Sequence, residues 1–147
     1  MKRNLLLFSL FLLFAGCLNF GKDVTLSGKE VDGTVLADVT KLTGVTFPDG
    51  TMGKEYLYFG SGIDDALVIK VSIPRDKKEE FFENAIFAAG RDEEPYINLG
   101  QGRSWWNVKS LAAPIHTIYD FPNGDMIECS VGEESGETIV YLSWITV

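Results

Sequence analysis

The sequence has only one histidine, His116, and only two cysteines, Cys17 and Cys129. A metal site built on two or three imidazoles is therefore excluded, as is a catalytic relay that needs more than one histidine. Cys129 has no histidine beside it and belongs to no Cys-x-x-Cys pair, so nothing marks it as a nucleophile. We expect no metal, no cofactor and no enzymatic activity.

Basic residues are also scarce, with 13 lysines and arginines against 21 aspartates and glutamates and a formal charge of −8 at pH 7. Binding to nucleic acid needs a basic stripe that displaces counterions from phosphates, and an acidic surface is likewise repelled by anionic lipid head groups. We therefore expect no nucleic-acid partner. The charge of the domain also gives it no means of adhering to a membrane.

Long hydrophobic runs are absent except at the N-terminus, where Leu5 to Phe14 is apolar apart from one serine. A membrane-spanning helix needs about 20 apolar residues, so this run is too short to favour a transmembrane anchor. Lys2-Arg3 precedes the run, and the small residues Ala15-Gly16 lead directly to Cys17. This order of a positive segment, an apolar segment and small residues is typical of an export signal.

These first seventeen residues resemble a bacterial lipoprotein signal, although Phe14 stands where leucine is usual. The resemblance implies that a peptidase removes residues 1–16 and that Cys17 carries fatty acyl chains, which are its contact with the membrane. If the cell has an outer membrane, the resemblance also implies that the protein is attached to it and faces the periplasm. The reason is that Leu18 stands where an aspartate would favour the inner membrane. The alternative is a plain secretory signal that is cut near Ala15.

The remaining chain divides into a short tether, residues 17–22, and one domain, residues 23–147. Apolar spacing predicts a helix from Asp32 to Leu42 that stops at Gly44, and the capping-box spacing of Asp76 and Glu79 predicts a second helix. Strands are predicted by alternating or dense apolar residues at 56–59, 67–73, 117–121, 126–131 and 138–145. This pattern indicates an α+β domain, in which an antiparallel sheet of about five strands carries two helices on one face.

Asn123-Gly124 predicts a hairpin with a two-residue type I′ turn. The register that follows pairs Phe121 with Met126 and puts Ile118 on the same inner face as Cys129. We therefore expect Cys129 to be buried and inert, and His116 to be a structural residue at the end of an apolar face.

From about Leu42 onward the chain also resembles a group of small bacterial exported proteins. The matching motifs are Phe47-Pro48, Asp64-Asp65 through Pro74, Trp105-Trp106 and Val140-Tyr141-Leu142. This resemblance implies export and brings no activity with it.

The irregular stretch 91–114 holds the residue types that supply anchors in binding interfaces, namely Tyr96, Arg103, Trp105 and Trp106. Neighbours in an extended chain point in opposite directions, which predicts one buried and one exposed tryptophan. The leading hypothesis is a noncatalytic envelope lipoprotein that contacts an envelope protein through this stretch. The alternatives are an immunity or exclusion protein that blocks an incoming toxin or phage, and an envelope hydrolase or transferase that uses His116.

Overall fold

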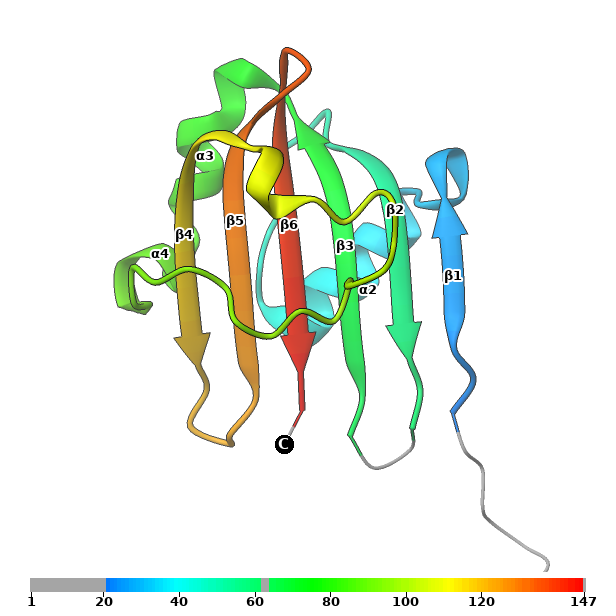
Figure 1. Cartoon of the computed structure of the whole chain (residues 1–147). Coiled ribbons are helices and arrows are strands. Elements are labelled where there is room, and N and C mark those ends of the chain that lie inside the picture. The colour runs from blue at the N-terminus through cyan, green and yellow to red at the C-terminus, as the bar shows by residue number, and fades with distance from the viewer. Residues whose placement is uncertain (1–20, 62–63, 147) are drawn as a thin grey trace, which may run out of the picture.

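The computed structural model of this chain describes residues 21–61 and 64–146. Cys17, the predicted signal peptide and most of the tether lie outside the described residues. The described chain contains one antiparallel sheet with the strand order β1-β2-β3-β6-β5-β4 (Figure 1). The strands are β1 Val24–Ser27, β2 Met52–Phe59, β3 Ala66–Ile73, β4 Ala112–Asp120, β5 Met126–Glu134 and β6 Glu137–Ile145. The predicted α+β class is thus confirmed.

The sixth strand, β1, is the strand that the sequence did not predict. It has four residues at the edge of the sheet, and only Leu26 is even partly buried. A strand of this length at the edge of a sheet has too little alternation of apolar and polar residues to be predicted from the sequence.

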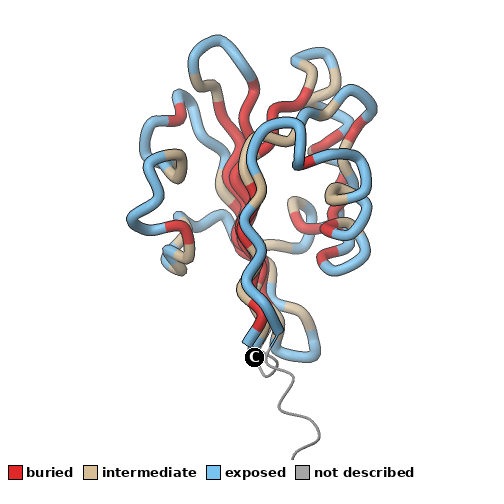
Figure 2. Tube along the Cα trace, turned by 90° about the vertical axis from the view of Figure 1, so that its right-hand side faces the viewer, coloured by how far each residue is buried: buried red, intermediate tan, exposed pale blue. Residues whose placement is uncertain are grey.

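Both faces of the sheet are covered (Figures 1 and 2). Helices α2 Gly33–Thr43, α3 Lys78–Phe82 and α4 Ala85–Ala89 lie on one face and enclose the larger core. Residues 91–111, here called the crossing segment, run across the opposite face. Double coverage explains why β3 and β6 are buried almost along their whole length, as expected for the two-sidedly apolar β6.

Helix α2 forms as its sequence predicts. The Asp32 side chain accepts hydrogen bonds from the backbone N–H groups of Thr34 and Val35, at 2.9 and 3.2 Å, and so satisfies two free donors of the first turn. Gly44 ends the helix in the left-handed conformation, with φ of 71°.

The prediction of one capped helix after Asp76 is wrong. A 3₁₀ turn at Arg75–Lys77 precedes two short helices, α3 and α4, and none of the three begins with a side-chain cap. The break lies at Asn84, whose amide donates to the carbonyl oxygens of Phe81 and Thr46 at 2.7 and 3.0 Å. This amide competes for carbonyls that a continuous helix would use, and it ties the break to a distant loop.

The predicted type I′ turn between β4 and β5 is also wrong, because the register is shifted by one residue. Phe121 N–H donates to the Asp125 carbonyl at 2.8 Å, and Gly124 N–H donates to the Phe121 carbonyl at 3.0 Å. Pro122 suits the second position of such a type I turn, and Gly124, with φ of 96°, completes a longer loop.

This shift places Ile118 opposite Glu128, on the face away from Cys129. Ile118 is nevertheless fully buried, and its backbone N–H and carbonyl pair with those of Arg91 at 2.9 and 2.8 Å. Cys129 is buried as predicted, and burial raises the pKa of its thiol far above the ordinary value.

Candidate binding site on the face covered by the crossing segment

A buried carboxylate fastens the first half of the crossing segment to the sheet. Glu128 on β5 is only 3% exposed, and its Oε1 accepts hydrogen bonds from the backbone N–H groups of Tyr96 and Ile97, both at 2.8 Å. Burial raises the pKa of Glu128 above its ordinary value, although the two backbone donors act in the opposite direction. Without these two bonds the buried carboxylate would keep only the Ser143 hydroxyl, 3.4 Å from its Oε2, so Glu128 and the segment depend on each other.

An aromatic contact fastens the second half. The ring of Trp106 packs edge-on against Tyr141, with centroids 5.1 Å apart and planes at 82°. Gly100 makes room for it, because a Cβ atom at that position would lie 2.1 Å from Trp106 Cγ. Leu111 and Ile139 complete this small cluster, which is separate from the helix-covered core. Trp106 is thus a packing residue of the crossing segment.

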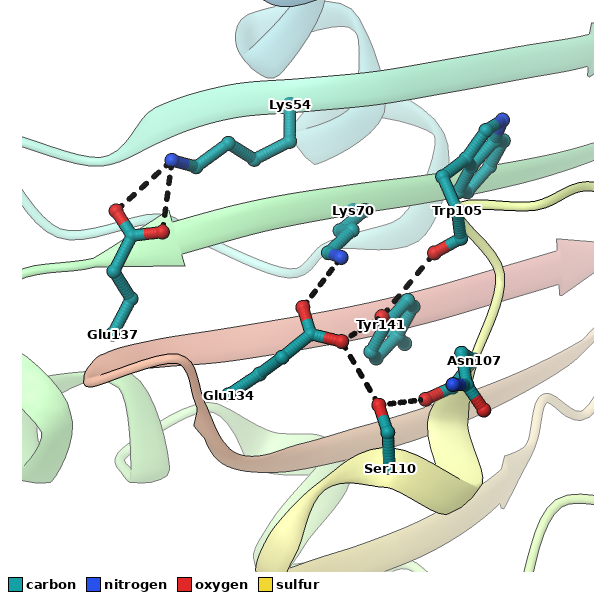
Figure 3. A network of polar contacts seen from close by, with 8 residues as sticks. All are labelled: Lys54, Lys70, Trp105, Asn107, Ser110, Glu134, Glu137 and Tyr141. Carbon is teal, nitrogen blue, oxygen red and sulfur yellow. Dashed lines mark hydrogen bonds and ion pairs between the residues drawn. The ribbon is translucent and has the colours of Figure 1, made fainter.

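A network of polar contacts surrounds Glu134 at the end of β5 (Figure 3). Lys70 Nζ lies 2.5 Å from Glu134 Oε2, and Glu134 Oε1 accepts from the hydroxyls of Ser110 and Tyr141 at 2.9 and 3.1 Å. Burial raises the pKa of Glu134, but the hydrogen bonds from Lys70, Ser110 and Tyr141 outweigh it, and the pKa is lower than usual. Glu134 is therefore ionised at neutral pH, and it holds Ser110 and the end of the crossing segment on the sheet.

The same network constrains the chain at Trp105. The Tyr141 hydroxyl lies 3.2 Å from the Trp105 carbonyl oxygen as well as 3.1 Å from Glu134. Its single proton can be donated to only one of these acceptors at a time. Lys70 Nζ also lies 5.1 Å from the centroid of the Tyr141 ring, a cation–π contact.

An open hollow of about 360 Å³ adjoins this network. Its lining combines one aromatic side chain with charges of both signs: Gly28, Lys54, Glu55, Lys70, Trp105, Glu134, Glu137 and Ile139. Lys54 reaches from β2 to Glu137 on β6, where its Nζ bonds both carboxylate oxygens at 2.9 and 3.0 Å. The hollow therefore offers hydrogen-bond donors and acceptors beside an aromatic side chain.

No family model, curated protein or solved structure matches this chain. Among the described residues, no group of three histidine, cysteine, aspartate or glutamate side chains is placed to hold a metal ion. In that same part of the chain, no helix has the length and apolar character needed to cross a membrane.

In the structure, the four predicted binding residues do not share one environment. Trp105 and Trp106 are both half-buried, so the predicted division into one buried and one exposed ring is wrong. They differ instead in their neighbours, because Trp105 lines the hollow and Trp106 packs on Tyr141. An extended chain would separate the two rings, but here they follow a turn in which Trp106 N–H donates to the Arg103 carbonyl at 3.1 Å.

Tyr96 lies away from the hollow. It is 64% exposed, and its hydroxyl donates to Met126 Sδ at 3.2 Å, near the start of β5. Glu134, beside the hollow, is eight residues further along that strand, or about 26 Å. Arg103 is exposed on the turn before Trp105. The structure thus brings Trp105 to the hollow and leaves Tyr96 outside it.

The charged residues of the hollow were not found from the sequence. Lys70 had the clearest signal, because it is the one charged residue in the apolar strand Ala66–Ile73. Glu134 and Glu137 lie at the two ends of the β5–β6 turn and belong to no motif in the sequence. Their use depends on partners that lie 64 and 83 residues away, Lys70 and Lys54.

His116 faces the same side of the sheet as Ser130, and its Nδ1 lies 2.8 Å from Ser130 Oγ. Ser130 is 1% exposed, so its hydroxyl is closed to a substrate. The contact gives Nδ1 of His116 and the buried Ser130 hydroxyl a hydrogen-bond partner, which suits the structural role expected for this histidine.

Proposed function

We propose that this chain is a noncatalytic lipoprotein of the bacterial envelope, and that its domain binds an envelope protein through the crossing segment. The observation that carries the proposal is the position of Trp105. Trp105 lines an open hollow together with two lysines and three glutamates, whereas its neighbour Trp106 packs against the sheet. A tryptophan at the wall of a polar hollow fits the anchor residues of protein interfaces.

The charges of the hollow suit a polar partner surface. The Lys54–Glu137 pair has side chains 33% and 44% exposed, and pairs this exposed contribute only about 0–1 kcal/mol. Partner groups can therefore replace it at little cost. The Lys70–Glu134 pair, 15% and 22% exposed, forms the firmer base of the hollow.

Attachment to the membrane comes from the sequence of the first seventeen residues. After cleavage before Cys17, the chain would carry 11 basic and 21 acidic residues, a formal charge of −10. Such a domain is repelled by anionic lipids, whereas acyl chains contribute about 0.8 kcal/mol per buried CH₂ group. Cys17→Ser should therefore release the chain from the membrane fraction or leave it uncut. An unchanged mass and membrane fraction in this variant would refute the lipid anchor.

The binding proposal is tested by capture of partners from solubilised envelope, with the acylated wild-type protein and with Trp105→Ala. We expect capture to weaken about 30-fold, since loss of an interface anchor costs about 2 kcal/mol. Lys109→Ala is the matched control, because Lys109 is an exposed residue of the same segment and does not line the hollow. Equal capture by wild type and Trp105→Ala, with both folded, would remove Trp105 as the anchor.

A further inference from the structure

We propose that the domain stands end-on on the bilayer, with the hollow at the end of the sheet that points away from the lipid. This inference rests on the proposed acylation of Cys17. It specifies the partner as a protein whose contact surface lies in the aqueous compartment, and not a membrane-embedded segment of a neighbouring protein.

The described chain begins at one end of the sheet. Gly21 lies against the backbone of Gly60, just after β2, such that a Cβ atom on Gly21 would be 3.0 Å from Gly60 Cα. The Asp23 carboxylate also accepts a hydrogen bond from Gly60 N–H at 3.2 Å. The tether thus reaches the domain where β2 ends and β1 begins.

The pairing of the strands shows which residues of the other strands lie at this same end of the sheet. Paired residues form one row from β2 to β4: Phe59, Ala66, Ile145, Met126 and Asp120. The β2–β3 and β4–β5 connections therefore lie at the same end as Gly21, here called the anchor end (Figure 1).

The hollow is built at the opposite end. Gly28 follows β1, Lys54 lies near the start of β2, and Glu134 pairs with Glu137 across the β5–β6 turn. From the row of Ala66 to the end of β3 at Ile73 is seven residues, or about 23 Å. Figure 1 shows the β5–β6 turn and the turn after β1 together at this end, with the β2–β3 and β4–β5 connections at the other.

The tether is too short to reverse this arrangement. Cys17 and Gly21 are four residues apart in the sequence, and a chain extends by at most about 3.6 Å per residue, so they are separated by no more than about 14 Å. That reach is less than the length of the sheet. An acyl group on Cys17 in the bilayer therefore keeps the anchor end near the lipid, and in the proposed end-on arrangement the hollow end points away from it.

Four variants, each with one added cysteine, test the orientation. Asp64→Cys and Asn123→Cys lie at the anchor end, and Lys29→Cys and Ser135→Cys lie at the hollow end. All four positions are exposed. The native Cys129 is fully buried with a raised pKa, so a thiol-reactive fluorophore labels the new cysteine selectively. The acylated protein, cleaved before Cys17, is placed in phosphatidylcholine vesicles that contain a lipid with a quencher on its head group.

We expect strong quenching at positions 64 and 123 and little quenching at positions 29 and 135. Equal quenching at positions 29 and 64 would mean that the domain lies on its β1 edge. Stronger quenching at position 135 than at position 123 would mean that the hollow end faces the lipid. Either result overturns the proposal. Flotation of the vesicles is a separate readout. A chain that does not float with them lacks the lipid anchor, which refutes the acylation and the orientation together, whereas floating protein with uniform quenching refutes the orientation alone.

Discussion

The rings of Trp105 and Trp106 meet nearly at right angles, with planes at 83° and centroids 5.7 Å apart. Each ring continues into a different environment. Trp106 touches Tyr141 and occupies the space left by Gly100, whereas Trp105 is one of the residues that line the hollow. Two adjacent, half-buried residues can therefore be separated by experiment.

Replacement of each tryptophan by alanine should have different effects on stability. Trp106→Ala should lower the free energy of unfolding by about 3 kcal/mol, because it opens a cavity against Tyr141 and frees the crossing segment. Trp105→Ala should lower it by about 1 kcal/mol, because one side of that ring already faces the hollow. Urea unfolding measures both. Equal and large losses would place both rings in the core and remove the reason to locate binding at Trp105.

Glu128 should make the domain less stable as the pH rises. Burial raises the pKa of this carboxyl, so between its unfolded and folded pKa values the native chain holds more protons than the unfolded chain. Stability therefore falls as the pH rises through that interval. Glu128→Gln keeps an acceptor for Tyr96 and Ile97 and cannot ionise. Its free energy of unfolding should exceed that of wild type at pH 7, and the difference should shrink as the pH falls through the interval.

Glu133→Gln is the control of opposite sign. The hydrogen bond from Thr138 lowers the pKa of Glu133, slight burial opposes it, and Arg75 lowers the pKa further. The ionised form therefore favours the native state, and this contribution disappears as the pH falls through the folded pKa. The glutamine variant should be no more stable than wild type at pH 7. If the stability of both variants relative to wild type changed in the same direction with pH, the opposite pKa shifts assigned to Glu128 and Glu133 would be wrong.

The two ion pairs of the hollow should differ in strength. A double-mutant cycle on Lys70 and Glu134 should give a coupling of about 2 kcal/mol, because both side chains are largely buried and share hydroxyl partners. The same cycle on the more exposed Lys54 and Glu137 should give about 0.5 kcal/mol or less. Added salt should reduce the second coupling more than the first. Equal couplings would contradict the view that the Lys70 pair is the firm base of the hollow.

Cys129 should behave as a small core residue. Cys129→Ala should be tolerated with a loss of about 1 kcal/mol, since a volume of about one sulfur atom is removed and the thiol has no bridge to break. In the native protein this thiol should react with labelling reagents only as fast as the domain opens. Rapid labelling under native conditions would contradict its burial.

Local sequence signals predicted those elements whose determinants lie within a few residues of each other. Helix α2 begins after Asp32 and ends at Gly44, as predicted. The alternating residues of β3 and the apolar run of β6 form strands, also as predicted. Capping and burial patterns act within one turn or one strand, so a local sequence signal is enough to reveal them. The same reasoning failed at Asn84. There a side chain bonds Thr46, 38 residues away, and splits the expected helix.

The hairpin shows a local signal that was misread. Asn123-Gly124 does mark a turn, but Pro122 presets the backbone one residue earlier and Gly124 closes a longer loop, so the register shifts by one. A shift of one residue moves a side chain to the other face of the sheet. Ile118 therefore lies on the face away from Cys129, where it is fully buried.

The sequence by itself determined the α+β class, the burial of Cys129 and the acidic surface, because composition and short-range periodicity are sufficient for these. Residues 1–17, whose order of segments predicts an export signal, are the basis of the proposed anchor. Only the tertiary structure decided that Glu128 and Trp106 hold the crossing segment to the sheet, and that Lys54, Lys70, Glu134 and Glu137 line one hollow with Trp105. Those residues come from separate strands, and their meeting depends on strand order and register, which no local pattern encodes.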